Sequence, residues 1–83
     1  MLVGGCDVGS ATGKAVVMRN HEIVSYEIIP STTKPEMTAR TVMDMALKKA
    51  GLSSISELDY IVGTGYGRLK VPFANENISE ITC

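Results

Sequence analysis

The sequence predicts an α/β fold in which a mixed β-sheet carries one helix on one of its faces. Two observations predict it. Short apolar segments recur between polar or glycine-rich turns, as strands do, and one longer stretch repeats apolar residues at steps of three and four, as an amphipathic helix does. In chain order this gives three strands, a helix, a fourth strand and a partial fifth strand. That order is typical of a sheet with a helix packed against it.

The first three strands are expected to form an antiparallel meander over residues 2–30. We assign them to Leu2–Val8, Lys14–Met18 and Ile23–Ile29, because each segment is apolar and tight turns separate them. Pro30 ends the third strand, since proline has no N–H to donate to a sheet.

A helix is expected over residues 34–51. Thr33 and Glu36 have the spacing of a capping box, Pro35 suits a first turn, and Gly51 suits the position after the last turn. The apolar stripe that would face the sheet consists of Ala39, Val42, Met43, Ala46 and Ala50.

The fourth strand is expected over residues 58–64, with a strand-end turn at 65–68. Pro72 places residues 70–74 in an edge strand or a loop. A partial last strand is expected over 78–83, which gives the order βββαβ(β).

Composition limits the class of protein. Eighty-three residues make one small domain, so a deep active site would have to be shared with further sequence or with another chain. The net charge of −1 offers no basic surface for nucleic acid, and no apolar run approaches the ~20 residues of a membrane span. The N-terminus is not signal-like, and the two cysteines, Cys6 and Cys83, lie far apart without CxxC spacing, which favours a reduced, cytoplasmic setting. Cys6 is expected in the core and His21 at the surface.

Asp7 ends the first strand, and small residues follow it up to Lys14. A carboxylate at this place suits hydrated Mg²⁺, and small side chains let backbone N–H groups approach phosphate oxygens. The segment is not a Walker A loop, because Val8 and Ala15 stand where that motif needs glycine and serine or threonine. From spacing alone, an ordinary hairpin turn with Asp7 in solvent remains the alternative.

Three segments together resemble one protein family. They are Asp7–Lys14, Gly63–Arg68 and Ile78–Cys83, which read D-V-G-S-A-T-G-K, G-T-G-Y-G-R and I-S-E-I-T-C. In order and spacing they resemble the ATPase activators of 2-hydroxyacyl-CoA dehydratases, such as 2-hydroxyglutaryl-CoA dehydratase, and of benzoyl-CoA reductases. These activators are part of the superfamily of acetate and sugar kinases, Hsp70 and actin. The second and third segments are the more specific.

The resemblance implies a ribonuclease-H-like mixed sheet, here residues 1–83 as an incomplete N-terminal subdomain of an actin/Hsp70-like ATPase. It implies binding of ATP or ADP with Mg²⁺. The family couples ATP hydrolysis to low-potential electron transfer through a [4Fe–4S] cluster shared by two subunits, whose ligands lie outside this chain. The implied partner is an acyl-CoA dehydratase or reductase component, and a homodimer or edge-paired oligomer is expected.

The same resemblance implies roles for individual residues. Asp7 would bind Mg²⁺ through water and take part in catalysis, and Glu80 would order a catalytic water. The nucleotide-binding residues would be Gly9, Ser10, Ala11, Thr12, Gly13, Lys14, Gly65, Tyr66, Gly67 and Arg68.

The sequence also departs from the family. At position 11 this sequence has alanine where the family typically has threonine. At position 13 it has glycine where the family typically has a residue other than glycine. The chain stops where the family continues towards its adenosine site. We therefore expect a half-site for the nucleotide phosphates alone, with weak affinity for nucleotide and negligible ATP hydrolysis. Two alternatives stay open: a stand-alone structural or interaction module without nucleotide binding, and the N-terminal half of a sugar or acetate kinase relative. The segments at 63–68 and 78–83 argue against the kinase.

Overall fold

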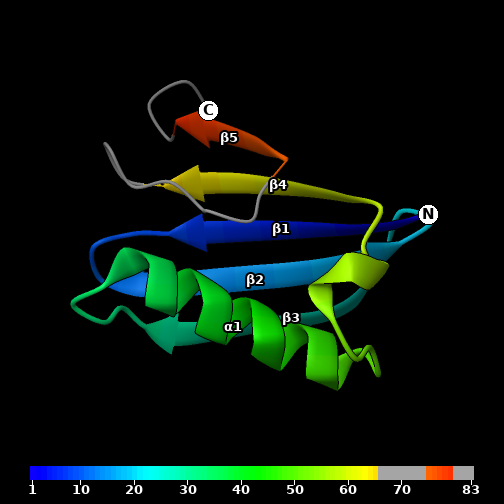
Figure 1. Cartoon of the computed structure of the whole chain (residues 1–83), viewed down its shortest axis with the longest axis horizontal. Coiled ribbons are helices and arrows are strands. Elements are labelled where there is room, and N and C mark those ends of the chain that lie inside the picture. The colour runs from blue at the N-terminus through cyan, green and yellow to red at the C-terminus, as the bar shows by residue number, and fades with distance from the viewer. Residues whose placement is uncertain (66–74, 80–83) are drawn as a thin grey trace.

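The computed structural model describes residues 1–65 and 75–79 and shows one five-stranded sheet with a helix across one face (Figure 1). The strands lie in the order β3-β2-β1-β4-β5. The elements are β1 Leu2–Val8, β2 Thr12–Arg19, β3 Glu22–Pro30, α1 Pro35–Lys49, a short 3-10 turn Ile55–Glu57, β4 Tyr60–Gly65 and β5 Glu76–Ser79.

The sheet is mixed, as predicted. The meander β1–β2–β3 is antiparallel, whereas β1 pairs with β4, and β4 with β5, in parallel. The helix α1 forms the crossover that returns the chain from β3 at one edge to β4 beside β1. Strand β5 begins at Glu76, two residues before the predicted start at 78, and the predicted end over 80–83 lies outside the described residues.

The predicted capping box at the start of α1 is wrong. Lys34 is the N-cap and no side chain caps the helix there. The hydroxyl of Thr38 instead accepts a 2.8 Å hydrogen bond from the backbone N–H of Thr32, which ties the incoming chain to the first turn. A capping box does occur at the 3-10 turn, between Ser54 and Glu57.

The far end of α1 agrees with the sequence. Gly51 follows the helix with a φ of +79°, a left-handed conformation that glycine adopts without steric cost. Lys48 and Lys49 lie in the last turn, where positive charge is favourable beside the free carbonyl groups.

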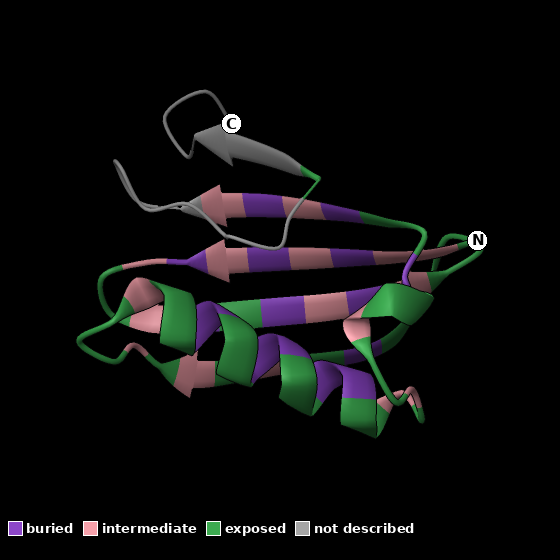
Figure 2. Ribbon diagram, in the orientation of Figure 1, coloured by how far each residue is buried: buried purple, intermediate pink, exposed green. Residues whose placement is uncertain are grey.

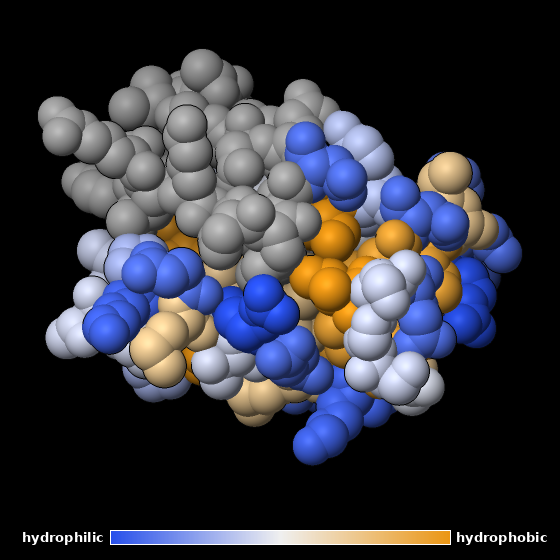
Figure 3. All heavy atoms as spheres, in the orientation of Figure 1, coloured by the Kyte–Doolittle hydropathy of each residue, from blue (hydrophilic) through white to orange (hydrophobic). Residues whose placement is uncertain are grey.

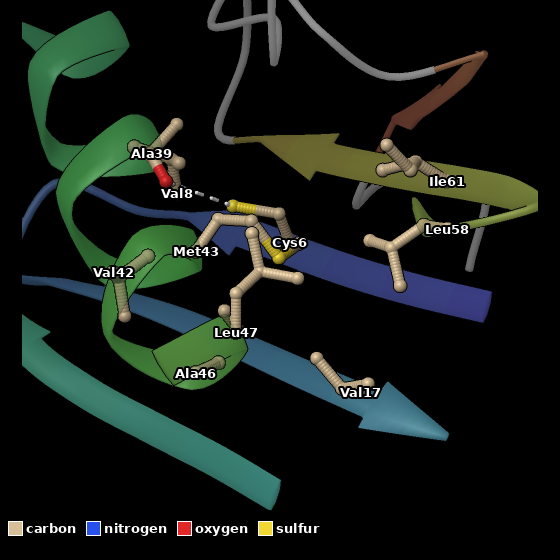
Figure 4. Packing of buried hydrophobic residues seen from close by; sticks show 11 residues of the cluster. Cys6, Val8, Val17, Ala39, Val42, Met43, Ala46, Leu47, Leu58 and Ile61 are labelled. Atoms are coloured by element: carbon tan, nitrogen blue, oxygen red, sulfur yellow. Dashed lines mark hydrogen bonds between the residues drawn. The ribbon is translucent and has the colours of Figure 1, made fainter. Parts of the chain in front are cut away.

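The hydrophobic core lies between α1 and the sheet (Figures 2 and 4). Alternate residues of β1 and β2 face the helix, because side chains of a strand point to opposite faces in turn. The buried apolar residues are Cys6, Val8, Ala15, Val17, Ala39, Val42, Met43, Ala46, Leu47, Leu58 and Ile61. Four of the five predicted stripe residues of α1 are among them, and Ala50 packs at the margin.

Cys6 lies in this core, as predicted, and is 2% exposed. Its Sγ approaches the carbonyl oxygen of Ala39 at 3.8 Å, which links β1 to the helix (Figure 4). Burial, and secondarily the negative charge of Asp7, raise the pKa of the Cys6 thiol from 9.0 to about 12. Cys6 is therefore an unreactive packing residue.

The β2–β3 hairpin explains the exposed position of His21. Asn20 and His21 have φ values of +51° and +71°, so both central residues of this two-residue turn are left-handed. Turns of this kind match the right-handed twist of the two strands. His21 is exposed, which confirms the prediction from sequence.

The two faces of the sheet differ in how they are covered. On the α1 side, hydrophilic residues predominate at the surface, with an apolar strip visible beside the grey atoms (Figure 3). The opposite face carries large apolar side chains in the open, including Tyr26 at 60% and Ile28 at 54% exposure. Parallel strands such as β1, β4 and β5 are usually covered on both faces. No helix among the described residues is long and apolar enough to cross a membrane.

Candidate functional site

Asp7 occupies the carboxyl end of the central strand β1. In register it lies between Lys14 of β2 and Thr64 of β4. Its neighbours Cys6 and Val8 are buried under α1, so the Asp7 side chain lies on the opposite, uncovered face. The same alternation places Lys14 and Thr64 on that face beside it, which brings three polar side chains from three strands together.

Two oxygen atoms at this place have unmet hydrogen-bonding capacity. Asp7 Oδ1 and Thr64 Oγ1 are buried, and neither has a hydrogen-bond partner among the described residues. Leaving a buried polar atom unpaired costs roughly 1–3 kcal/mol, so such atoms are rare in folded proteins. Their occurrence on neighbouring strands, in register, is typical of a site built for a polar ligand.

A pocket of about 320 Å³ opens on the uncovered face next to these atoms. Besides the three polar residues, its wall is mostly apolar. The lining residues are Gly5, Cys6, Asp7, Lys14, Ala15, Val16, Tyr26, Glu27, Ile28, Val62 and Thr64.

In the turn that follows Asp7, backbone carbonyl oxygens accept the hydrogen bonds that fix its conformation. The N–H of Gly9 donates to the carbonyl oxygen of Thr12 at 2.8 Å, which closes the turn. Ser31 then donates twice, from its Oγ to the Gly9 carbonyl at 2.6 Å and from its backbone N–H to the Ala11 carbonyl at 2.9 Å. The β3–α1 connection thus fixes the β1–β2 turn.

Two backbone amide groups of this turn, those of Ser10 and Ala11, are left available. Ser10 and Ala11 are exposed, and within the described part of the chain no hydrogen bond engages their backbone N–H groups. Successive free N–H groups in a tight turn form a concavity that attracts anions. The turn therefore offers donors for phosphate oxygens directly beyond the Asp7 carboxylate.

Gly13 has a packing role in the structure. It lies in β2 and faces α1, where the Cγ2 methyl group of Thr38 takes the space that a Cβ at this position would need. Gly65 ends β4 and lies in register with Val8, so it stands at the same end of the sheet as Asp7. The remaining predicted site residues, Tyr66, Gly67, Arg68 and Glu80, lie outside the described residues.

Thr64 was not among the residues singled out from the sequence. A polar residue at the end of an apolar strand, within the run G-T-G-Y-G-R, was the signal available. Only the parallel pairing of β4 with β1 shows that this residue is the neighbour of Asp7.

The donor set fits a hydrated Mg²⁺ ion. Mg²⁺ retains several waters in proteins and is held by one or two carboxylates, and Asp7 offers one carboxylate with an unpaired oxygen beside the Thr64 hydroxyl. An iron–sulfur cluster does not fit the described residues, among which no three His, Cys, Asp or Glu side chains are grouped. Cys6, whose thiol stays protonated, is unsuited to be a thiolate ligand.

The chain is similar to known activator proteins, although no family model matches it. It is 39% identical over its whole length to the "Activator of lactoyl-CoA dehydratase" of Anaerotignum propionicum and 37% identical to the "2-hydroxyisocaproyl-CoA dehydratase activator" of Clostridioides difficile. It covers 32% and 31% of these two proteins, so it spans about a third of the curated relatives that it matches.

Solved structures agree with the sequence comparison. The activator of the 2-hydroxyisocaproyl-CoA dehydratase from Clostridium difficile with bound ADPNP matches the whole chain with a TM-score of 0.84 and 34% identity, over 31% of that protein. A ROK hexokinase from Thermus thermophilus matches 83% of the chain, and 24% of its own, with a TM-score of 0.67 at 20% identity, which shows a shared fold.

The fold is therefore the α/β fold of actin/Hsp70-like ATPases, as the sequence predicted, and the ROK hexokinase shares it. Over its whole length the chain is similar to activators of 2-hydroxyacyl-CoA dehydratases, and it spans about a third of each of them.

Proposed function

We propose that this chain is the N-terminal portion of an ATP-hydrolysing activator of an acyl-CoA dehydratase or reductase and supplies its first phosphate-binding loop. The observation that carries the proposal is the unpaired, buried Asp7 Oδ1 at the end of β1, next to a turn whose free amides can bind phosphate. Its homologue from C. difficile has a structure with bound ADPNP, which supports a nucleotide as the ligand.

In this proposal Asp7 binds Mg²⁺ through water, and the ion, when bound, neutralises charge on the β- and γ-phosphates. In the turn from Gly9 to Thr12, Ser10 and Ala11 contribute their free backbone N–H groups, and Ser10 and Thr12 contribute their hydroxyls. Lys14 is exposed and lies in register with Asp7, so its ammonium group adds positive charge at the same end of the sheet. Gly65 ends β4 in register with Val8 and so stands at the same end of the sheet.

The relatives support a role for the complete protein. Their names describe activators of lactoyl-CoA and 2-hydroxyisocaproyl-CoA dehydratases. We propose that ATP hydrolysis in the complete dimeric, cytoplasmic protein drives low-potential electron transfer to such a dehydratase, or to a benzoyl-CoA reductase. The described residues offer no ligand set for the [4Fe–4S] cluster, so other parts of the complete protein would hold it.

Titration calorimetry of the 83-residue chain with Mg-ATP tests the loop assignment. We expect weak binding, in the millimolar range, and its loss in Asp7→Asn. Asp44→Asn is a matched control, because it makes the same substitution at an exposed position of α1. Micromolar binding would contradict the half-site, and equal binding by Asp7→Asn and wild type would remove Asp7 from the site.

A second candidate function is an interaction module that binds no nucleotide. The uncovered apolar face, with Tyr26 and Ile28 exposed on β3, favours it. This candidate predicts self-association in sedimentation experiments, lost in Tyr26→Ser/Ile28→Ser, and no response of the protein to Mg-ATP. A response that depends on Asp7 favours the activator.

A further inference from the structure

We propose that Thr64 is a positioning residue of the phosphate site, which together with Asp7 orients a water molecule bound to the Mg²⁺ ion. This inference rests on the proposed function. It assigns to β4 a role that its glycine-rich sequence does not reveal.

The pairing of β1 with β4 places the two side chains together. Asp7 and Thr64 are register partners in parallel strands, and both line the 320 Å³ pocket on the uncovered face. Gly5, two residues before Asp7 on the same face, lines the pocket without filling it, and a Cβ added there would lie 3.0 Å from the Val16 Cγ1.

The hydrogen-bonding state of the two residues points to a shared ligand. Asp7 Oδ1 and Thr64 Oγ1 are both buried and both unpaired, so they do not bond to each other despite their adjacent positions. An ionised carboxylate only accepts hydrogen bonds, and a hydroxyl both accepts and donates. The pair therefore presents two acceptors on neighbouring strands.

A metal-bound water matches these two acceptors. Its lone pair faces the cation, and its two hydrogens remain to be donated. Asp7 Oδ1 and Thr64 Oγ1 can take one each, and both unpaired atoms are then satisfied. A phosphate oxygen is a poorer match, because it has no hydrogen to give to the carboxylate. Residues that hold metal-bound groups in this way typically contribute about 10- to 100-fold to metal affinity.

The test compares Thr64→Val, which replaces the hydroxyl by a methyl group of similar size, with Thr64→Ser, which keeps the hydroxyl. ADP binding is followed by ¹⁵N NMR with Mg²⁺ and with EDTA. We expect Thr64→Val to weaken binding of Mg-ADP about 10-fold and to leave binding of metal-free ADP unchanged. Thr64→Ser should bind both like wild type.

A second measurement uses the protein without ligand. Because the Thr64 hydroxyl has no partner among the described residues, we expect Thr64→Val to melt at or above the temperature of wild type. A lower melting temperature than that of Thr64→Ser would mean that the hydroxyl has a structural partner, and would overturn the proposal.

The outcomes separate the two proposals. If Thr64→Val weakens ADP binding equally with and without Mg²⁺, the water-orienting role is overturned. Unchanged Mg-ADP binding by Thr64→Val would overturn it as well. Neither outcome contradicts the proposed phosphate-binding loop. If wild type binds ADP no better with Mg²⁺ than with EDTA, the Mg²⁺ site at Asp7 fails, and the role of Thr64 fails with it.

Discussion

The Cγ2 methyl group of Thr38 in α1 occupies the space that a side chain at position 13 of β2 would need. Thr38 is fully buried, and its hydroxyl accepts a hydrogen bond from the backbone N–H of Thr32. Gly13 thereby allows the first turn of the helix to lie close to the strand that leaves the candidate phosphate turn.

Gly13→Ala is expected to destabilise the fold. The added methyl group meets a β-branched side chain that has little rotamer freedom, and overpacking of this kind costs roughly 1–3 kcal/mol. Urea denaturation measures the free energy of unfolding. Gly9→Ala is the matched control, because its Cβ would lie 3.5 Å from the Thr12 carbonyl oxygen, an ordinary contact.

Thr38→Ser should rescue Gly13→Ala. It removes the methyl group and keeps the hydroxyl that holds Thr32. In a double-mutant cycle we expect the two substitutions together to cost less than the sum of each alone, by about 1 kcal/mol or more. Additive effects would show that the Thr38 methyl group is not the obstacle.

Asp7→Asn should not reduce the stability of the ligand-free protein. The substitution removes a charge whose Oδ1 is buried without a partner, so the folded state loses no hydrogen bond through this atom. We expect a melting temperature equal to or above that of wild type, as is common when a binding residue is neutralised. A clear decrease would identify Asp7 as a structural residue.

The buried thiol of Cys6 predicts a stability loss in alkali. Its pKa is raised in the folded protein from 9.0 to about 12, so above pH 9.0 the unfolded chain loses this proton while the folded one keeps it. The free energy of unfolding should fall as pH rises from 9.0 to about 12, by at most about 1.4 kcal/mol per pH unit.

The contribution of Cys6 is isolated by comparison with Cys6→Ala in a Cys83→Ser background. Lysine and tyrosine titrate in the same range and affect both proteins equally. The difference in unfolding free energy between them should therefore shrink with rising pH. Parallel curves across this range would contradict a raised pKa.

His21→Gly should stabilise the β2–β3 hairpin. The φ of His21 is +71°, a conformation that is costly for a residue with a Cβ, and Asn-Gly is the favoured pair for such a turn. We expect a gain of roughly 0.5–1 kcal/mol in thermal denaturation. Glu22→Gly, in the adjoining strand, should instead be destabilising, and a loss in both variants would contradict the turn assignment.

Glu57 should titrate below its ordinary pKa of 4.5. The hydroxyl of Ser53 donates to its Oε2 at 2.9 Å, and the backbone N–H groups of Ser53 and Ser54 donate at 2.6 and 3.1 Å; these bonds stabilise the carboxylate and lower the pKa. The resulting stability is present above pH 4.5 and is lost as pH falls through the lowered pKa.

NMR titration of Ser53→Ala checks the cause of this shift. Removing the hydroxyl donor should raise the pKa of Glu57 towards 4.5, while the backbone donors keep part of the effect. Ser56→Ala is the control, since the Ser56 hydroxyl bonds to Ser54 Oγ rather than to Glu57. An equal pKa change in both variants would point to a general loosening of the turn.

Local pattern was sufficient for the elements of this fold. Alternation and turn residues placed β1 to β4, and the spacing of Ala39, Val42, Met43 and Ala46 identified the buried side of α1. The helix start was misjudged, because the Thr38 hydroxyl that ties Thr32 to the first turn is buried between helix and sheet. A capping rule based on the spacing of Thr33 and Glu36 does not predict a hydrogen bond to the buried Thr38 hydroxyl.

The sequence by itself determined the order of strands and helix, the burial of Cys6 and the polar end of β1 at Asp7. Only the tertiary structure decided that Thr64 lies beside Asp7, that Thr38 fills the space next to Gly13, and that the described helix covers one face of the sheet while Tyr26 and Ile28 are exposed on the other. The physical reason is that alternation, turns and caps arise between residues close in the chain. Strand register and helix docking arise between residues far apart in it, and they are set by how the whole sheet packs.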